Sequence, residues 1–146
     1  MNLNATLFLS LLTILLVSCS VKHEPIRYGT DSCDFCKMLI MDNRSGAEIV
    51  TTKGKVYKFD DINCLVMYIE ANVSDKSTLA HQLVTDYNGT EQMNEVDDAF
   101  FVHSENLRTP MASEVVAFLS EEDRKAFLTK TEGKSLSWAE VCELFK

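Results

Sequence analysis

The sequence predicts an α+β fold in which two small β-β-α(-β) modules pack as one body. Short β-branched runs separated by turn residues indicate hairpins. In each half of the chain, such runs come before a segment with helical spacing of apolar residues. The chain has 146 residues, of which 46% are hydrophobic and 25% charged, and these values are typical of a globular protein. We expect the modules at about residues 33–80 and 81–146.

The first 18 residues are expected to form a lipoprotein signal peptide. The uncharged run Leu7–Val17 is too short to span a bilayer, which takes about 20 apolar residues, and matches a signal-peptide core. The sequence Leu16-Val17-Ser18-Cys19 resembles the lipobox of bacterial lipoproteins, which implies cleavage before Cys19 and lipidation of its sulfur. We therefore expect a lipoprotein anchored to a membrane on the periplasmic side of the cell envelope, with a polar tether over residues 19–32.

The first module should contain a hairpin followed by a helix. The segment Gly46–Thr52 is β-branched, Lys53-Gly54 offers a turn, and Lys55–Phe59 follows as a second strand. Asp60 or Asp61 can cap the next helix. Apolar residues in that helix follow the i, i+3, i+4, i+7 spacing, at Ile62, Leu65, Val66 and Ile69.

The second module should begin with strands at Gln82–Tyr87 and Ala99–His103, and Asn88-Gly89 is a hairpin turn signal. Pro110-Met111 should break the chain before a short helix over Ala112–Leu119.

Two further helices have capping signals at their starts. Ser120 opens a helix that should run to about Lys130, and Gly133 can end it. Ser137 and Glu140 have the spacing of a second capping box, before a last helix that reaches Phe145.

Charge and motifs exclude several functions. The net charge is −8 and no Lys/Arg cluster exists, so we expect no nucleic-acid partner. No His-Glu-x-x-His or Gly-x-Ser-x-Gly motif occurs, and no other nucleophile–base pattern stands out. The protein is therefore expected not to be an enzyme.

The segment Cys33–Asp42 concentrates two Cys and two Met residues. Thiolates and thioethers are soft donors that favour Cu(I). Cys36 and Met38 are two residues apart, so on an extended backbone both sulfurs would project from one face. A third donor must come from elsewhere, and Met111 is a candidate because Pro110 restricts the backbone before it. His103, at a predicted strand end, is another candidate.

The pair Cys33 and Cys36 has other interpretations. A Cys-x-x-Cys pair can be a redox pair, half of a zinc site or a local disulfide. If Cys19 is lipidated, Cys33, Cys36, Cys64 and Cys142 remain, and they allow three pairings into two disulfides. Cys64 lies in a predicted helix and is expected to be a core residue, and Cys142, in the last predicted helix, is expected to be core or a disulfide partner.

The sequence resembles the NosL family of copper-binding lipoproteins that assist assembly of nitrous oxide reductase. The similarity consists of ordered motifs: Cys19, the run Cys36–Asp42, the run Gly54–Asp61, and Thr109-Pro110-Met111. It implies a pair of β-β-α-β modules, and Cu(I) bound by Cys36, Met38 and Met111. It also implies copper delivery to nitrous oxide reductase through a membrane ABC transporter complex. Lys37 and Ala112 stand where the family usually has Gly.

Two hypotheses follow. The first is a lipid-anchored Cu(I) metallochaperone without turnover. The second is a thiol–disulfide redox or zinc-binding module built on Cys33 and Cys36. Substitution of Met38 separates them, because a thioether matters to Cu(I) and hardly matters to zinc or to disulfide exchange.

Overall fold

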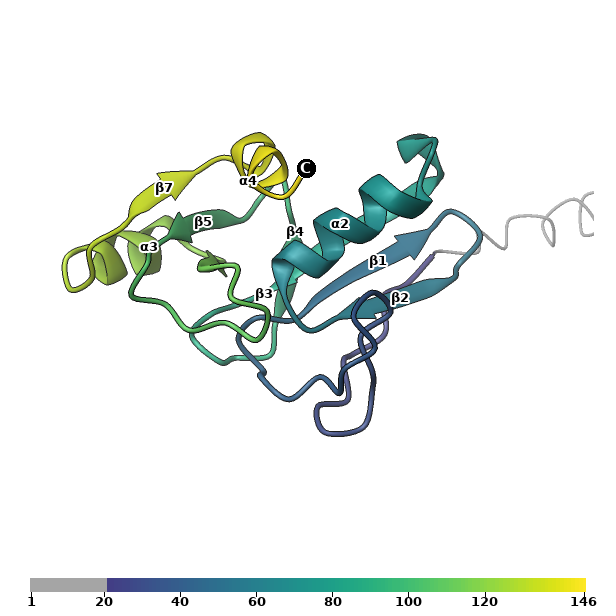
Figure 1. The fold of residues 1–146 in the computed structure, drawn as a ribbon, viewed down its shortest axis with the longest axis horizontal. Coiled ribbons are helices and arrows are strands. Elements are labelled where there is room, and N and C mark those ends of the chain that lie inside the picture. The colour runs from purple at the N-terminus through teal and green to yellow at the C-terminus, as the bar shows by residue number, and fades with distance from the viewer. Residues whose placement is uncertain (1–20) are drawn as a thin grey trace, which may run out of the picture.

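The computed structural model describes residues 21–146 and shows an α+β fold with two small antiparallel sheets, which confirms the predicted fold class (Figure 1). The first sheet has the order β2-β1-β3-β4, formed by β1 (Ala47–Thr51), β2 (Val56–Phe59), β3 (Leu79–Thr85) and β4 (Met93–Glu95). The second has the order β6-β5-β7, formed by β5 (Phe100–His103), β6 (Val115–Phe118) and β7 (Lys134–Leu136).

The predicted hairpin and helix of the first half are confirmed. Strands β1 and β2 pair antiparallel, with Ala47 opposite Phe59. Helix α2 (Ile62–Asn72) follows and lies across the face of these two strands (Figure 1). Its buried side chains include the four apolar residues that the helical spacing selected. Burial of this face fixes the start of α2 directly beside the end of β2.

Strand β3 follows the 3-10 helix η2 (Lys76–Thr78) and pairs antiparallel with β1. Its other edge pairs with β4, with Thr85 opposite Met93. The connection between β3 and β4 includes Gly89 at φ 76°, in the left-handed region that glycine tolerates. The first sheet is therefore built from two hairpins joined through β1 and β3.

The predicted helix over Ala112–Leu119 is wrong. This segment contains strand β6, which pairs antiparallel with β5 and is buried along its whole length. Two physical reasons account for the difference. Val115 and Val116 are β-branched and favour a strand, and Ala112 and Glu114 have φ of 53° and 58°, which no right-handed helix contains.

The last two helices begin where their capping signals predicted. Helix α3 (Glu121–Leu128) has Ser120 at its N-cap, and α4 (Trp138–Leu144) has a complete capping box between Ser137 and Glu140. The prediction that Gly133 ends α3 is wrong, because the helix stops at Leu128. Gly133 comes just before β7, where a Cβ atom would lie 2.8 Å from the carbonyl oxygen of His103.

One hydrophobic core joins the two sheets. It contains Val84 of β3, Phe101 of β5, Ala117 of β6 and Val141 of α4. A bridge between Asp86 and Ala117 links the end of β3 to β6. The two sheets consequently behave as one packed body around residues that come from both halves of the chain.

The segment before β1 packs against the domain from Glu24 onward. Ile26 is buried in the core, and the Glu24 backbone N–H donates to the buried carboxylate of Glu48. Asp31 is also buried and accepts hydrogen bonds from Arg27 and Lys58. Within residues 21–146, no helix has the length and apolar character that crossing a membrane requires.

Candidate metal centre

Cys33 and Cys36 lie in a tight turn and not on an extended strand. The Cys33 N–H donates to the Met38 carbonyl at 2.8 Å, and the Lys37 N–H donates to the Cys33 carbonyl at 3.0 Å. Lys37 itself has φ of 67°. The backbone from Cys33 to Met38 is therefore a turn, so the extended backbone from which we expected Cys36 and Met38 to share a face is wrong.

Two hydrogen bonds attach this turn to the edge of the first sheet. The Asp34 N–H donates to the Lys58 carbonyl at 2.8 Å, and the Lys58 N–H donates to Asp34 Oδ2 at 2.8 Å. Lys58 is in β2, two residues before Asp60. The turn is consequently held beside the junction between β2 and α2.

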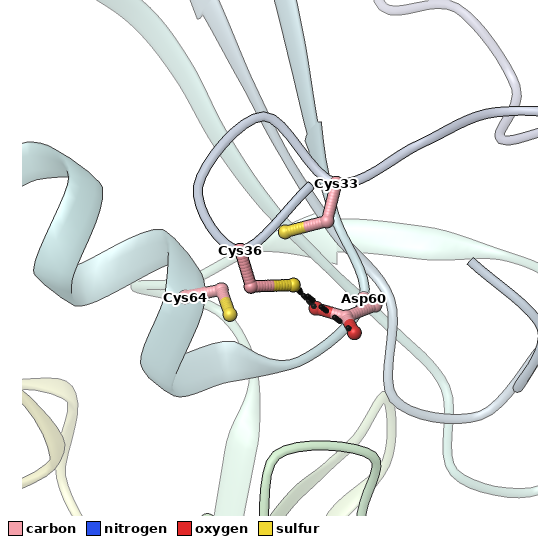
Figure 2. Close-up of side chains that lie close together, drawn as sticks. All are labelled: Cys33, Cys36, Asp60 and Cys64. Atoms are coloured by element: carbon pink, nitrogen blue, oxygen red, sulfur yellow. Dashed lines mark hydrogen bonds between the residues drawn. The ribbon is translucent and has the colours of Figure 1, made fainter. Parts of the chain in front are cut away.

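Four potential ligands meet at that junction. The sulfurs of Cys33, Cys36 and Cys64 and a carboxylate oxygen of Asp60 all lie within 4.8 Å of one another. Figure 2 shows the thiols of the turn and of α2 directed toward the same small space. Cys36 Sγ lies 3.4 Å from Asp60 Oδ1 and donates to it. We call these four residues the thiol–carboxylate cluster.

The cluster is closed except at Cys36. Cys33 is 0% exposed, Cys64 1% and Asp60 2%, whereas Cys36 is only half-buried. A solute can therefore reach the cluster at Cys36, while the other three groups are shielded from water.

Hydrogen bonds and burial separate the pKa values of the three thiols. A hydrogen bond from Cys64, aided by backbone N–H groups including those of Phe35 and Cys36, lowers the pKa of Cys33 to about 6. The pKa of Cys64 is strongly raised, first because its thiol donates to Cys33. Burial raises the pKa of Cys36 to about 11. The first proton to leave the cluster is therefore that of Cys33, whose thiolate the neighbours stabilise.

A second loop approaches the same end of α2. The Met111 N–H donates to Asp61 Oδ2 at 2.8 Å, and Asn63 Nδ2 donates to the Met111 carbonyl at 3.2 Å. Asp61 occupies the N-cap position of α2 but makes no side-chain cap bond. Its buried carboxylate instead holds the Met111 loop. Because Asp61 directly follows Asp60, this loop is attached next to the thiol–carboxylate cluster.

The other predicted ligands, Met38, Met111 and His103, differ in exposure and in their neighbours. Met38 is 57% exposed and Met41 67%, and Met111 is half-buried against the core. His103 lies outside the thiol–carboxylate cluster, with Nε2 3.6 Å from a Glu114 carboxylate oxygen. It lines an open surface pocket with Ser104 and Glu132.

The cysteines of residues 21–146 are all unbridged. Cys142 is not part of the cluster and lies on α4, half-buried near Val66 and Ile69. Cys19, the predicted lipidation site, lies outside the described residues.

Sequence reasoning missed Asp60 and Cys64 as members of the cluster. Asp60 was interpreted as a possible helix cap and Cys64 as core, and Cys64 is indeed buried. The signal available in the sequence was their spacing, since residues 60 and 64 are one helical turn apart at a helix start. That spacing indicates a shared site only once the structure shows the Cys33–Cys36 turn lying beside Asp60 and Cys64.

The fold and this site define a small α+β domain that carries three thiols and a carboxylate in position to bind a metal ion. The sequence matches the NosL family model over residues 27–144, and the chain belongs to the NosL family. Its fold is similar to the crystal structure of the copper chaperone NosL from Shewanella denitrificans, with a TM-score of 0.69 at 20% identity. That match covers 83% of this chain and 96% of the other. No curated protein matches the sequence.

The two positions at which the resemblance implied glycine, Lys37 and Ala112, both have left-handed backbone. Lys37 has φ of 67° and Ala112 has φ of 53°. Glycine adopts this region without steric cost, whereas a Cβ atom makes it unfavourable. The loops that present Cys36 and Met111 therefore each hold a residue with a Cβ atom in backbone that favours glycine.

Proposed function

We propose that this protein is a lipid-anchored metallochaperone that binds Cu(I) and delivers it for maturation of nitrous oxide reductase. Membership in the NosL family supports the proposal, as does the shared fold with a NosL protein named as a copper chaperone. The protein would act as a carrier without turnover.

The observation that carries the proposal is the attachment of two sulfur-bearing loops to one helix end. Asp60 accepts a hydrogen bond from Cys36, and the adjacent Asp61 accepts one from the Met111 backbone. Residues 36 and 111 are far apart in sequence, yet neighbouring residues at the start of α2 hold both. We propose Cys36, Met38 and Met111 as the Cu(I) ligands, with His103 as a further candidate.

The chemistry of this donor set suits transfer. Cys36 supplies one anionic thiolate after its proton is displaced by the metal. The two thioethers are neutral and soft, so they favour Cu(I) without adding charge. Thioethers also cannot form disulfides, which suits an oxidising compartment. A site with one charged ligand and exposure at Met38 can pass copper to a partner by ligand exchange.

The proposed partners follow from the family resemblance and the N-terminal motif. A lipid on Cys19 would anchor the domain to a membrane on the periplasmic side of the cell envelope. Copper would then pass through an ABC transporter complex of the assembly machinery to nitrous oxide reductase, the eventual client.

The test is anaerobic competition for Cu(I) between the reduced protein and a chromophoric chelator. Wild-type protein should bind one Cu(I). Cys36→Ser should weaken binding most, because it removes the anionic ligand. Met38→Leu and Met111→Leu should each weaken it at least tenfold, since even groups behind the ligands often contribute that much. His103→Gln tests the further candidate.

Matched controls use the same substitutions outside the site. Met67→Leu changes an exposed methionine on α2, and Cys142→Ser changes a cysteine outside the cluster. Both should bind copper as wild type does. If Met38→Leu and Met111→Leu leave the affinity unchanged, the mixed thiolate–thioether site is wrong and the dithiol alternative gains support.

A further inference from the structure

We propose that the end of the first sheet at the β1–β2 turn is a membrane-contact surface, on which Lys22, Lys53 and Lys55 bind anionic phospholipid headgroups. We call these three lysines the basic end. The inference rests on the lipid anchor proposed at Cys19 and adds an electrostatic contact with the same bilayer. Acyl chains and basic surfaces act together in many membrane-attached proteins.

The segment that follows the proposed anchor is fixed along the first sheet. The Glu24 N–H donates to the buried Glu48 carboxylate of β1 at 3.1 Å. The Pro25 carbonyl accepts a hydrogen bond from Lys58 Nζ of β2 at 2.9 Å. Because Glu48 and Lys58 are cross-strand partners, neighbouring positions of the sheet hold two successive residues of the segment. The sheet therefore sets the path by which the chain enters the domain.

This path begins at the basic end. The Val21 carbonyl oxygen lies 3.4 Å from His81 Nε2, and His81 is the cross-strand partner of Val50, which comes three residues before Lys53. Figure 1 shows the start of the described chain beside the β1–β2 turn, with α3 and β7 at the opposite end of the molecule. Cys19 is two residues before Val21, and two residues reach at most about 7 Å. A lipid on Cys19 would therefore keep this end of the domain at the bilayer surface.

The charge of the basic end is opposite to that of the whole chain. The net charge is −8, so anionic headgroups repel the domain overall. Lys22, Lys53 and Lys55 are exposed, and none of them forms an ion pair with a carboxylate of residues 21–146. The carboxylate of Asp75, which lies near the same turn, accepts from the Ser77 N–H within η2. The lysines come from two separate segments, and the fold brings them to one positively charged end.

The orientation that results leaves the candidate metal centre accessible. Lys55 directly precedes β2 and Asp60 directly follows it, and the four residues of this strand span roughly 13 Å at 3.3 Å per residue. The thiol–carboxylate cluster therefore lies away from the headgroups when the basic end contacts them. Cys36, the half-buried entry to the cluster, remains open to a partner on the periplasmic side.

The test uses the mature lipoprotein, purified from membranes and reconstituted into phosphatidylcholine vesicles with or without phosphatidylglycerol. A water-soluble amine-reactive reagent labels exposed lysines, and peptide mass spectrometry measures the labelling rate of each. Phosphatidylglycerol should slow labelling of the basic end about fivefold or more, since each lysine near an anionic surface contributes about that factor in binding. Exposed Lys130 and Lys134, which flank the opposite end, should be labelled equally in both vesicles. High salt should remove the protection, because it screens the contact.

Variants decide whether the charges act as proposed. Lys53→Gln/Lys55→Gln should remain on the vesicles through its lipid and lose the protection that phosphatidylglycerol gives Lys22. Lys130→Gln/Lys134→Gln removes the same charge elsewhere and should behave as wild type does.

Three results would overturn the membrane-contact surface. They are equal labelling of the basic end on neutral and anionic vesicles, equal protection of Lys130 and Lys134, and undiminished protection of Lys22 in the Lys53→Gln/Lys55→Gln variant. Retention of the wild-type protein on neutral vesicles measures the lipid anchor separately. Failure of the anchor and failure of the basic contact therefore give different results.

Discussion

The backbone N–H of Met111 donates a hydrogen bond to the buried carboxylate of Asp61 over 2.8 Å, across a sequence separation of 50 residues. Asp61 holds the N-cap position of α2 without making the usual cap bond. Burial raises the pKa of this carboxyl group. The helix thus lacks a local capping bond, and the carboxylate instead ties a distant methionine loop to the candidate metal centre.

Asp61→Ala should therefore loosen the Met111 loop. The substitution leaves the Met111 N–H without its acceptor, and such a loss costs about 1–3 kcal/mol of the free energy of unfolding. Cu(I) affinity should fall as well, because Met111 is no longer held in place. Urea unfolding and chelator competition measure the two effects. Asp98→Ala, at an exposed aspartate, is the control. A folded Asp61→Ala protein with wild-type copper affinity would speak against Met111 as an anchored ligand.

Glycine in place of Lys37 or Ala112, both of which have left-handed backbone, should stabilise the protein. Lys37→Gly and Ala112→Gly each remove a Cβ atom from unfavourable backbone, which gains roughly 1–2 kcal/mol. The greater freedom of glycine in the unfolded chain offsets about half of that gain. We expect each variant to have a free energy of unfolding about 0.5–1 kcal/mol higher, measured by urea denaturation.

Lys53→Gly is the matched control for Lys37→Gly, because Lys53 is exposed and lies outside the left-handed region. It should leave stability unchanged or lower it. Equal effects of Lys37→Gly and Lys53→Gly would show that the backbone conformation at residue 37 carries no strain.

Buried Glu48 should make stability depend on pH. Burial raises the pKa of Glu48 to about 7 from its ordinary 4.5, although the Glu24 N–H and the charge of Lys58 oppose the shift. A carboxyl group with a raised folded-state pKa favours the folded protein fully below its unfolded pKa. That contribution is lost as pH rises from about 4.5 through about 7. The loss is on the order of 3 kcal/mol.

Glu48→Gln isolates this effect from other titrating groups, such as His81. The difference in the free energy of unfolding between the variant and wild type should grow in favour of the variant between pH 5 and pH 7.5. Denaturant unfolding at several pH values measures it. A difference that stays constant over this range would contradict a raised pKa at Glu48.

Cys19 should be the first residue of the mature protein. Intact mass spectrometry of the membrane fraction should find a chain that starts at Cys19 and carries a diacylglycerol group. Cys19→Ser should leave the precursor uncleaved and without lipid. A mature wild-type protein that begins at another residue would exclude the lipoprotein interpretation.

The sequence by itself determined the local elements of this protein. Hairpin β1–β2, helix α2 and the caps at Ser120 and Ser137 depend on contacts within a few residues, and they appear as predicted. The ordered motifs around Cys19, Cys36, Gly54–Asp61 and Met111 likewise sufficed to indicate the NosL family, which the family match over residues 27–144 shows. Such features can be inferred from sequence because spacing and residue type directly encode them.

Tertiary structure alone decided the rest. The apolar run Val115–Phe118 has no period that separates a helix from a strand, and pairing with β5 adds to the β-branched preference of Val115 and Val116 to make it a strand. The thiol–carboxylate cluster forms because Asp34 and Lys58 dock the Cys33 turn beside Asp60 and Cys64. Hydrogen bonds between segments distant in sequence leave no periodic pattern in either segment. The sequence therefore indicated Cys36 as a candidate donor, whereas the membership of Asp60 and Cys64 and the meeting of all four groups at the start of α2 required the fold.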